Sequence, residues 1–231
     1  AQIAKGAVLC YQRKTRIEKA RSRVKDEKFF WWLFLVGVLS ATIELFLMAW
    51  YANSTIGLAD AVDALIHGLW YGIAIYEYRT VRKLNMPHEA REQFRSRITH
   101  AYIVLFYGSL GYVVLFQAIP RFFNPAVIAP LYMLAGVGIG IAGNAVSFCI
   151  LWKARRAMES SGERQRFLQF VLHAVVDSGI SAAVLSYAII LYLHPRPSPL
   201  FSYDAPLTFI LVAVAGIMGY GVFKKGHHGH L

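Results

Sequence analysis

Six long apolar stretches dominate this chain and limit the folds that it can adopt. About 20 consecutive apolar residues suffice for a helix to cross the hydrocarbon core of a bilayer. Hydrophobic residues make up 57% of the 231 residues and charged residues only 16%, which is too apolar for an ordinary soluble domain. The sequence therefore predicts an all-α integral membrane protein, a bundle of six transmembrane helices that cover residues 29–51, 56–78, 99–121, 128–152, 168–193 and 205–223.

The basic residues indicate how this bundle is oriented. Six crossings bring both termini to the same side of the membrane, and Lys and Arg accumulate in short cytoplasmic loops. Of the 24 Lys and Arg residues, all but Arg121 and Arg196 lie in the segments on the side of the termini. We therefore expect cytoplasmic termini, with the plasma (inner) membrane as the location. The same asymmetry accounts for most of the net charge of +11, so that charge does not indicate nucleic-acid binding.

Three parts are expected: a basic cytoplasmic arm at 1–28, a transmembrane domain at 29–223 and a short cytoplasmic tail at 224–231. The arm has no apolar central region of the kind that a cleavable signal peptide requires. It either lies as a helix along the anionic inner leaflet or forms a solvated, partly disordered segment. Cys10 and Cys149 have a spacing typical of neither a disulfide framework nor a metal site, so a structural role is expected.

Two of the apolar stretches each carry an aspartate and a histidine one helical turn apart: Asp63 with His67, and His173 with Asp177. Residues at i and i+4 share one face of a helix, so two such helices packed face to face bring two imidazoles and two carboxylates together. Ionisable side chains within a membrane are costly and normally face the bundle interior or a water-filled pathway. A single one often only bridges helices, but four at matched spacing favour a metal site.

Other polar residues extend these stripes. Asp60, Asp63 and His67 lie at i, i+3 and i+7 and so share one face of the second stretch. Ser181 follows Asp177 by one turn in the fifth stretch. Asp60 is a candidate accessory ligand or proton relay. Glu44 and Asn144 are candidates for the same roles, with polar contacts between helices as the alternative.

The Gly138-x-Gly140-x-x-Gly143 segment matches a dinucleotide-binding fingerprint, but it lies within an apolar helix and no strand precedes it. Small residues at such spacing let helix backbones approach closely in membranes. Close helix packing is therefore the prediction for this segment.

The predicted ligand set favours zinc. Two imidazole nitrogens and two carboxylate oxygens suit tetrahedral zinc and also admit cadmium or cobalt, whereas calcium and magnesium prefer shells of oxygen alone. Histidine titrates near neutral pH and ligands must lose protons to bind metal, so metal and protons compete. His67 and His173 are the predicted proton carriers, with the carboxylates as further candidates. We expect a transporter rather than an enzyme, with Zn²⁺ as transported substrate and no organic cofactor.

These residues resemble the cation diffusion facilitator family, zinc transporters that exchange metal for protons. Leu172-His173-Ala-Val-Val-Asp177 matches the Leu-His-x-x-x-Asp motif of the family's fifth helix. In the second helix, Asp63 falls where the family has its first ligand, and His67 falls where the family usually has Asp, so the order of this pair is reversed. The resemblance covers roughly residues 29–223 and includes Ile43-Glu44, Asn124-Pro125, Gly143-Asn144 and Asp204-x-Pro206.

The resemblance implies proton-coupled export of the metal by a homodimer. Members of the family usually continue into a cytoplasmic ferredoxin-like domain that dimerises, and some have a histidine-rich cytoplasmic loop. Here eight residues follow the sixth stretch, and Lys153–Gln165 contains no histidine. We therefore expect the subgroup that lacks the C-terminal domain, with dimerisation through the membrane helices or the basic arm.

Two alternatives and one peripheral feature stay open. The tail residues His227, His228 and His230 form either a low-affinity zinc collector or a merely polar terminus. A membrane metal-sensing or partner-binding module without transport fits the same residues. A haem-binding redox protein would also use histidines on two helices, although carboxylates beside the axial nitrogens speak against it.

Overall fold

The computed structural model describes residues 28, 30–84, 86–155, 161–194 and 199–228, with some side chains inside the helices left out. The predicted arm lies almost entirely outside this part of the chain, as do Cys10 and His230. Within the described residues every regular element is helical, as the composition predicts.

Among the described residues, six helices are long and apolar enough to cross a membrane, which confirms the predicted six-helix bundle. Each observed span overlaps the stretch predicted for it. The third is the most extended, because its helix begins well before the apolar residues do. The spans cover Phe30–Ala52, Thr55–Glu77, Glu92–Phe123, Pro130–Lys153, Ala174–Leu193 and Leu200–Ile217.

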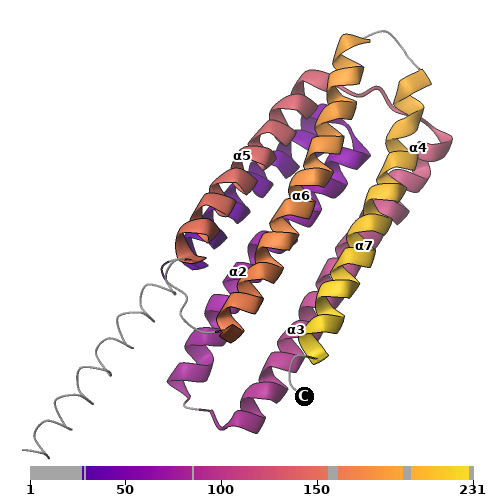
Figure 1. Ribbon diagram of the computed structural model, residues 1–231. Coiled ribbons are helices and arrows are strands. Elements are labelled where there is room, and N and C mark those ends of the chain that lie inside the picture. The colour runs from indigo at the N-terminus through magenta and orange to yellow at the C-terminus, as the bar shows by residue number, and fades with distance from the viewer. Residues whose placement is uncertain (1–27, 29, 85, 156–160, 195–198, 229–231) are drawn as a thin grey trace, which may run out of the picture.

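The helices run side by side as a bundle (Figure 1). The complete elements after the first helix are α2 (Thr55–Lys83), α3 (His88–Tyr112), α4 (Ile119–Phe123), α5 (Pro130–Arg155), α6 (Ser161–Leu193) and α7 (Asp204–His228), with a short 3₁₀ turn, η3 (Pro199–Tyr203), before α7. Two π-helical segments, η1 (Leu47–Ala52) and η2 (Val113–Ala118), lie within the first and third spans.

The π-helical segment η2 lies next to a proline. Pro120 has no backbone N–H to donate to the preceding turn, and such a site within a membrane helix is accommodated by local adjustment of the hydrogen bonding. The N–H of Ile119 accordingly bonds the carbonyl of Val114, five residues back. The third span thus continues from α3 through η2 into α4 without a break.

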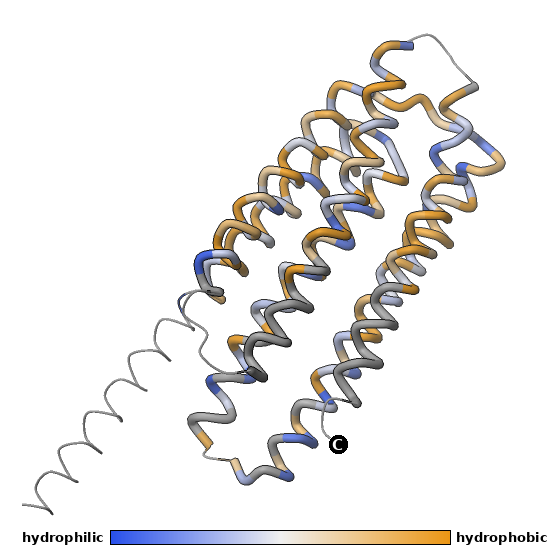
Figure 2. Tube along the Cα trace, in the orientation of Figure 1, coloured by the Kyte–Doolittle hydropathy of each residue, from blue (hydrophilic) through white to orange (hydrophobic). Residues whose placement is uncertain are grey.

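The second span is the central one. α2 contacts α3, α5, α6, α7 and both π-helical segments. Of an apolar stretch of 18 residues in this span, 41% is buried, against 22–33% in the other spans. Figure 2 shows apolar residues along most of the bundle, as a membrane requires. Polar side chains on the buried faces of α2 are therefore held away from lipid by neighbouring helices.

Glycines bring the first span into close contact with α2. A Cβ added at Gly68 would lie 2.9 Å from the backbone carbon of Gly37 and 2.9 Å from the nitrogen of Val38. These distances are well below the usual separation of about 3.5–4.0 Å between carbon atoms. The two backbones can therefore approach this closely only because both positions are glycine.

A glycine face of α5 also packs against the first span. An added Cβ at each of three positions would collide with a side chain of that span, whereas Gly138 has nothing within 4 Å. The predicted close packing is thus confirmed for two of the three glycines of the fingerprint, and a third glycine outside it takes part. The facing pairs are Gly136 with Met48, Gly140 with Glu44, and Gly143 with Ser40.

We call the end of the bundle where the first and second spans connect the Asn53 end, and the opposite one the Leu84 end. At the Asn53 end, Asp204 at the start of α7 caps α2. Its carboxylate accepts hydrogen bonds from the Ser54 hydroxyl at 2.7 Å and from the backbone N–H and hydroxyl of Thr55 at 2.7 and 2.6 Å. A carboxylate at a helix N-terminus satisfies free N–H groups and interacts favourably with the helix dipole.

A second set of hydrogen bonds at the Asn53 end joins the third span to the loop after the first span, and that loop to the one before the fourth span. The Arg121 guanidinium donates to the backbone and side-chain oxygens of Asn53, and the Asn53 side-chain amide donates to the Val127 carbonyl at 3.1 Å. Asn53 has a left-handed backbone conformation with φ 58°, which asparagine tolerates better than most residues. The Asn53 end is therefore held together by polar contacts that involve the second, third and sixth spans and the loops after the first and third spans.

Candidate metal centre

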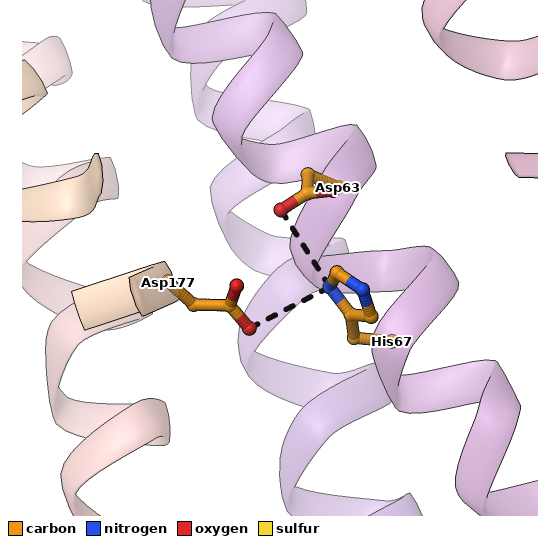
Figure 3. A group of neighbouring side chains, drawn as sticks. All are labelled: Asp63, His67 and Asp177. Atoms are coloured by element: carbon orange, nitrogen blue, oxygen red, sulfur yellow. Dashed lines mark ion pairs between the residues drawn. The ribbon is translucent and has the colours of Figure 1, made fainter. Parts of the chain in front are cut away.

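Three side chains predicted as metal ligands meet between α2 and α6. Nδ1 of His67 lies 3.5 Å from Oδ2 of Asp63 and 3.6 Å from Oδ2 of Asp177. One potential ligand atom from each residue lies within 4.8 Å of the others. Figure 3 shows the two aspartates pointing at the same ring nitrogen of His67, Asp63 from the helix that carries His67 and Asp177 from α6. A single ion can therefore contact all three.

The helical repeat positions two of these residues. Asp63 and His67 are one turn apart on α2, so both face α6. With a rise of 1.5 Å per residue they lie about 12 and 18 Å along the helix from Thr55, on either side of the middle of a hydrocarbon core about 30 Å thick. The group thus lies near mid-depth of the second span.

The site is enclosed by packing. Side-chain exposure is 4% for Asp63, 14% for His67 and 15% for Asp177. The ring of Phe106 on α3 lies 5.8 Å from the His67 ring, centroid to centroid, and belongs to a buried cluster with Ile66 and Tyr102. This aromatic wall fixes the position of the imidazole and separates the site from lipid on that side.

The predicted fourth ligand lies on the same helix as Asp177. His173 is one turn before Asp177 within α6, but its side chain is outside the part of the chain that the structure describes. Its role as a ligand therefore stays a prediction. The structure brings together the other three predicted ligands.

The charges at the site favour a dication. The ion pairs described for Asp63 and Asp177 are both with His67, and one imidazolium offsets only one of two carboxylates. Oδ1 of Asp63 is buried and has no hydrogen-bond partner among the described residues, which leaves an acceptor for a cation. A divalent ion would neutralise both carboxylates, and an uncompensated charge in an apolar interior is costly.

The donor set indicates which ion fits. An imidazole nitrogen with two carboxylate oxygens provides three ligands of the kind that Zn²⁺ binds, and a histidine from the adjacent turn of α6 would complete a tetrahedral shell. Mg²⁺ and Ca²⁺ bind oxygen ligands in shells of six or more. The arrangement therefore suits a transition metal.

The candidate accessory residues lie outside this group. Asp60 on α2 is buried and accepts a hydrogen bond from Ser181 on α6 at 3.2 Å, and Glu44 of the first span is buried beside it. Asn144 is half-buried on α5 and is not one of the converging ligands. Asp60 and Glu44 thus form a polar cluster of their own.

The three tail histidines are the candidates for a peripheral zinc site. The backbone of His227 and His228 belongs to the last turn of α7, but their side chains are outside the described part of the chain, like all of His230. Cys149 lies exposed on α5 as a free thiol. Zinc binding by the tail stays a prediction.

Sequence reasoning missed the role of Asp204. In the sequence, Asp204 is only part of the resemblance before the sixth span, whereas in the structure its buried carboxylate caps α2 at Thr55, which lies eight residues before Asp63. An Asp followed by Pro at the start of a helix is an available signal for a helix N-terminus. Nothing local indicates that the carboxylate serves a second helix 149 residues away in the chain.

The chain matches no protein-family model, and it has no significant match among curated proteins. The functional argument therefore depends on the residues and their geometry.

Proposed function

We propose that this protein is a proton-coupled exporter of divalent transition metal, with zinc as the main substrate. The observation that carries the proposal is the convergence of Asp63, His67 and Asp177 at mid-depth of a membrane-spanning bundle. Ionisable residues at such depth generally mark ion pathways. A site that faces a bundle interior and suits Zn²⁺ is what a zinc transporter requires.

The coupling to protons follows from the same residues. An empty site holds two carboxylates and one imidazole, so removal of the metal leaves negative charge within the bundle unless protons replace it. Histidine exchanges protons near neutral pH, and metal ligands must be deprotonated to bind. Metal release and proton uptake are therefore alternatives at one site, and alternating access to the two sides would couple their movements.

The orientation of the chain supports export. Lys and Arg are concentrated in the segments at the Leu84 end, before the first span and after the last, and such residues favour the cytoplasm. We infer that the Leu84 end is cytoplasmic and the Asn53 end external, in a plasma (inner) membrane. The resemblance to cation diffusion facilitators agrees with this direction of transport. It also implies a homodimeric assembly.

Transport requires the Asn53 end to open, because the site lies below it. Asp204 with Thr55 and Arg121 with Asn53 tie the spans together at that end. Release to the outside would therefore break these contacts and re-form them once per cycle. We infer that they act as the external closure of the pathway.

The proposal is tested by zinc flux into proteoliposomes under an imposed pH gradient. The parent chain should accumulate zinc in proportion to the gradient, and Asp177→Asn should abolish accumulation because it removes a charged ligand without changing volume. Ser178→Ala is the matched control, since this neighbouring hydroxyl is exposed and bonds only the Ala174 carbonyl among the described contacts. It should transport like the parent.

Two results would contradict the proposal. Flux that survives Asp177→Asn would move the transport site elsewhere. A folded parent that binds zinc but transports none would favour the metal-sensing or partner-binding module instead.

A further inference from the structure

A second polar cluster lies one helical turn nearer the Asn53 end than the candidate metal centre. It consists of Glu44 from the first span, Asp60 from α2 and Ser181 from α6, with exposed fractions of 1%, 3% and 3%. None of these residues belongs to the group of converging metal ligands. Three helices thus bury two acids and a hydroxyl at one point within the membrane-spanning part of the bundle.

The two acids are neighbours. Ser181 donates a hydrogen bond to Oδ1 of Asp60 at 3.2 Å, and the carboxyl groups of Glu44 and Asp60 lie within hydrogen-bonding reach of each other. Two of their oxygens, Oε1 of Glu44 and Oδ2 of Asp60, are buried without a hydrogen-bond partner among the described residues. A hydrogen bond between two carboxyl oxygens needs a proton that neither carboxylate carries when ionised.

The bundle makes room for this pair. A Cβ at Gly140 of α5 would lie 2.8 Å from Cδ of Glu44, so only glycine lets the carboxyl group occupy this place. The Glu44 carboxyl group is therefore packed against both Gly140 of α5 and Asp60 of α2.

The charges around the pair are negative. Two further acids, Asp63 and Asp177, interact with Asp60, and the ion pairs given for the described residues include no cation bound to Glu44 or Asp60. Two adjacent carboxylates in a dry environment do not both stay ionised. A single shared proton removes one charge and supplies the missing hydrogen bond.

A metal ion fits the pair less well. Mg²⁺ requires a nearly octahedral shell and Ca²⁺ requires six to eight oxygens, whereas the cluster offers two carboxyl groups and one hydroxyl. Zinc binds preferentially with nitrogen or sulfur among its ligands in structural and catalytic sites, and none lies in this cluster. The proton is the one cation that needs only the two facing oxygens.

We propose that Glu44 and Asp60 form a proton-binding site that is separate from the metal ligands and holds one proton between their carboxyl groups. In terms of the proposed function, on which this part depends, the pair lies between the metal centre and the external side. It is thus placed to take up a proton when the Asn53 end opens. Exchange then uses at least one proton that does not come from a metal ligand.

Infrared spectroscopy of the purified, metal-free protein tests the proton site without any transport. A protonated carboxyl group has a C=O stretching band that a carboxylate lacks, and the parent-minus-variant difference spectrum isolates the contribution of the pair. The variant is Glu44→Gln with Asp60→Asn. The matched control is Glu89→Gln, which removes an exposed carboxylate at the start of α3.

We expect the difference spectrum of the double variant to contain the acid band of one carboxyl group, and that of the control to contain carboxylate bands only. Loss of carboxylate bands alone from the double variant would overturn the proton site, since both acids would then be ionised in the parent. Should the double variant not fold, Glu44→Gln alone decides, because the amide donates to Asp60 and makes the proton unnecessary.

Flux measurements under a pH gradient then test the role in coupling. We expect the double variant to lose the stimulation of zinc flux by the gradient, and unaltered stimulation would overturn that role. If the parent itself shows no zinc flux, the proposed transport function fails, while the infrared result still decides whether the pair holds a proton.

Discussion

The contact between Gly37 and Gly68 predicts a large difference between two glycine-to-alanine substitutions. In Gly68→Ala, the new methyl group meets backbone atoms of the first span at 2.9 Å, about 0.6 Å or more below a normal contact distance. Backbone cannot move aside as a flexible side chain does, so the two helices must separate. Gly138→Ala is the matched control, because nothing lies within 4 Å of its new methyl group.

Two contributions to the free energy of unfolding oppose each other in Gly68→Ala. Overfilling a packed interface costs about 1–3 kcal/mol, and replacing glycine within a helix by alanine returns about 0.5–1 kcal/mol. Gly68→Ala should therefore lower the free energy of unfolding by up to about 2.5 kcal/mol, while Gly138→Ala raises it by about 0.5–1 kcal/mol. Because both variants gain the alanine term, they should differ by the cost of overfilling alone, about 1–3 kcal/mol, which corresponds to about 2–12 °C in Tm for a chain of this size.

Thermal unfolding in detergent, followed by far-ultraviolet circular dichroism, measures this difference. The parent and both variants are compared at equal protein and detergent concentration. If Gly68→Ala unfolds at the same temperature as Gly138→Ala, the first span and α2 do not touch at this point. The reasoning about the close approach would then be refuted.

Two further predictions concern the cap and the choice of metal. Asp204→Ala leaves the Thr55 N–H without its acceptor and removes a charge from the N-terminus of α2. The free energy of unfolding, measured by the same assay, should therefore fall by about 2–4 kcal/mol. A loss as small as that of an exposed substitution would show that water replaces the cap. Magnesium in large excess should leave zinc bound in a competition assay, because His67 supplies nitrogen and Mg²⁺ selects oxygen ligands; displacement of zinc by magnesium would contradict the assigned ligands.

The sequence predicts the bundle well because its main signal is local. Each span is a run of apolar residues long enough to cross a bilayer, and that property needs no knowledge of neighbours. The convergence of Asp63 and His67 with Asp177 was also predictable, because i and i+4 positions fix two residues on one face and buried polar stripes require partners. Whether His173 joins them is beyond the described side chains and stays a prediction.

What the sequence could not supply is pairing between distant segments. The capping of α2 by Asp204 joins residues 149 apart, and the alignment of Glu44 with Gly140 depends on the relative height of two antiparallel helices. The predicted third stretch, 99–121, already includes Pro120, but the π-helical turn before this proline was not predicted, for a different reason. A proline suggests a helix end, and only neighbouring contacts decide that the helix continues through a π-helical turn instead.

The central claim is that Asp63, His67 and Asp177 hold one metal ion, and X-ray absorption spectroscopy at the zinc edge tests it most directly. The measurement uses the zinc-loaded protein in which the tail residues His227, His228 and His230 are replaced by alanine, so that only the site in the bundle contributes. We predict one zinc per chain with nitrogen and oxygen ligands at about 2.0–2.2 Å, and loss of this signal in Asp177→Asn but not in Ser178→Ala. A sulfur ligand, or a spectrum that Asp177→Asn leaves unchanged, would contradict the account.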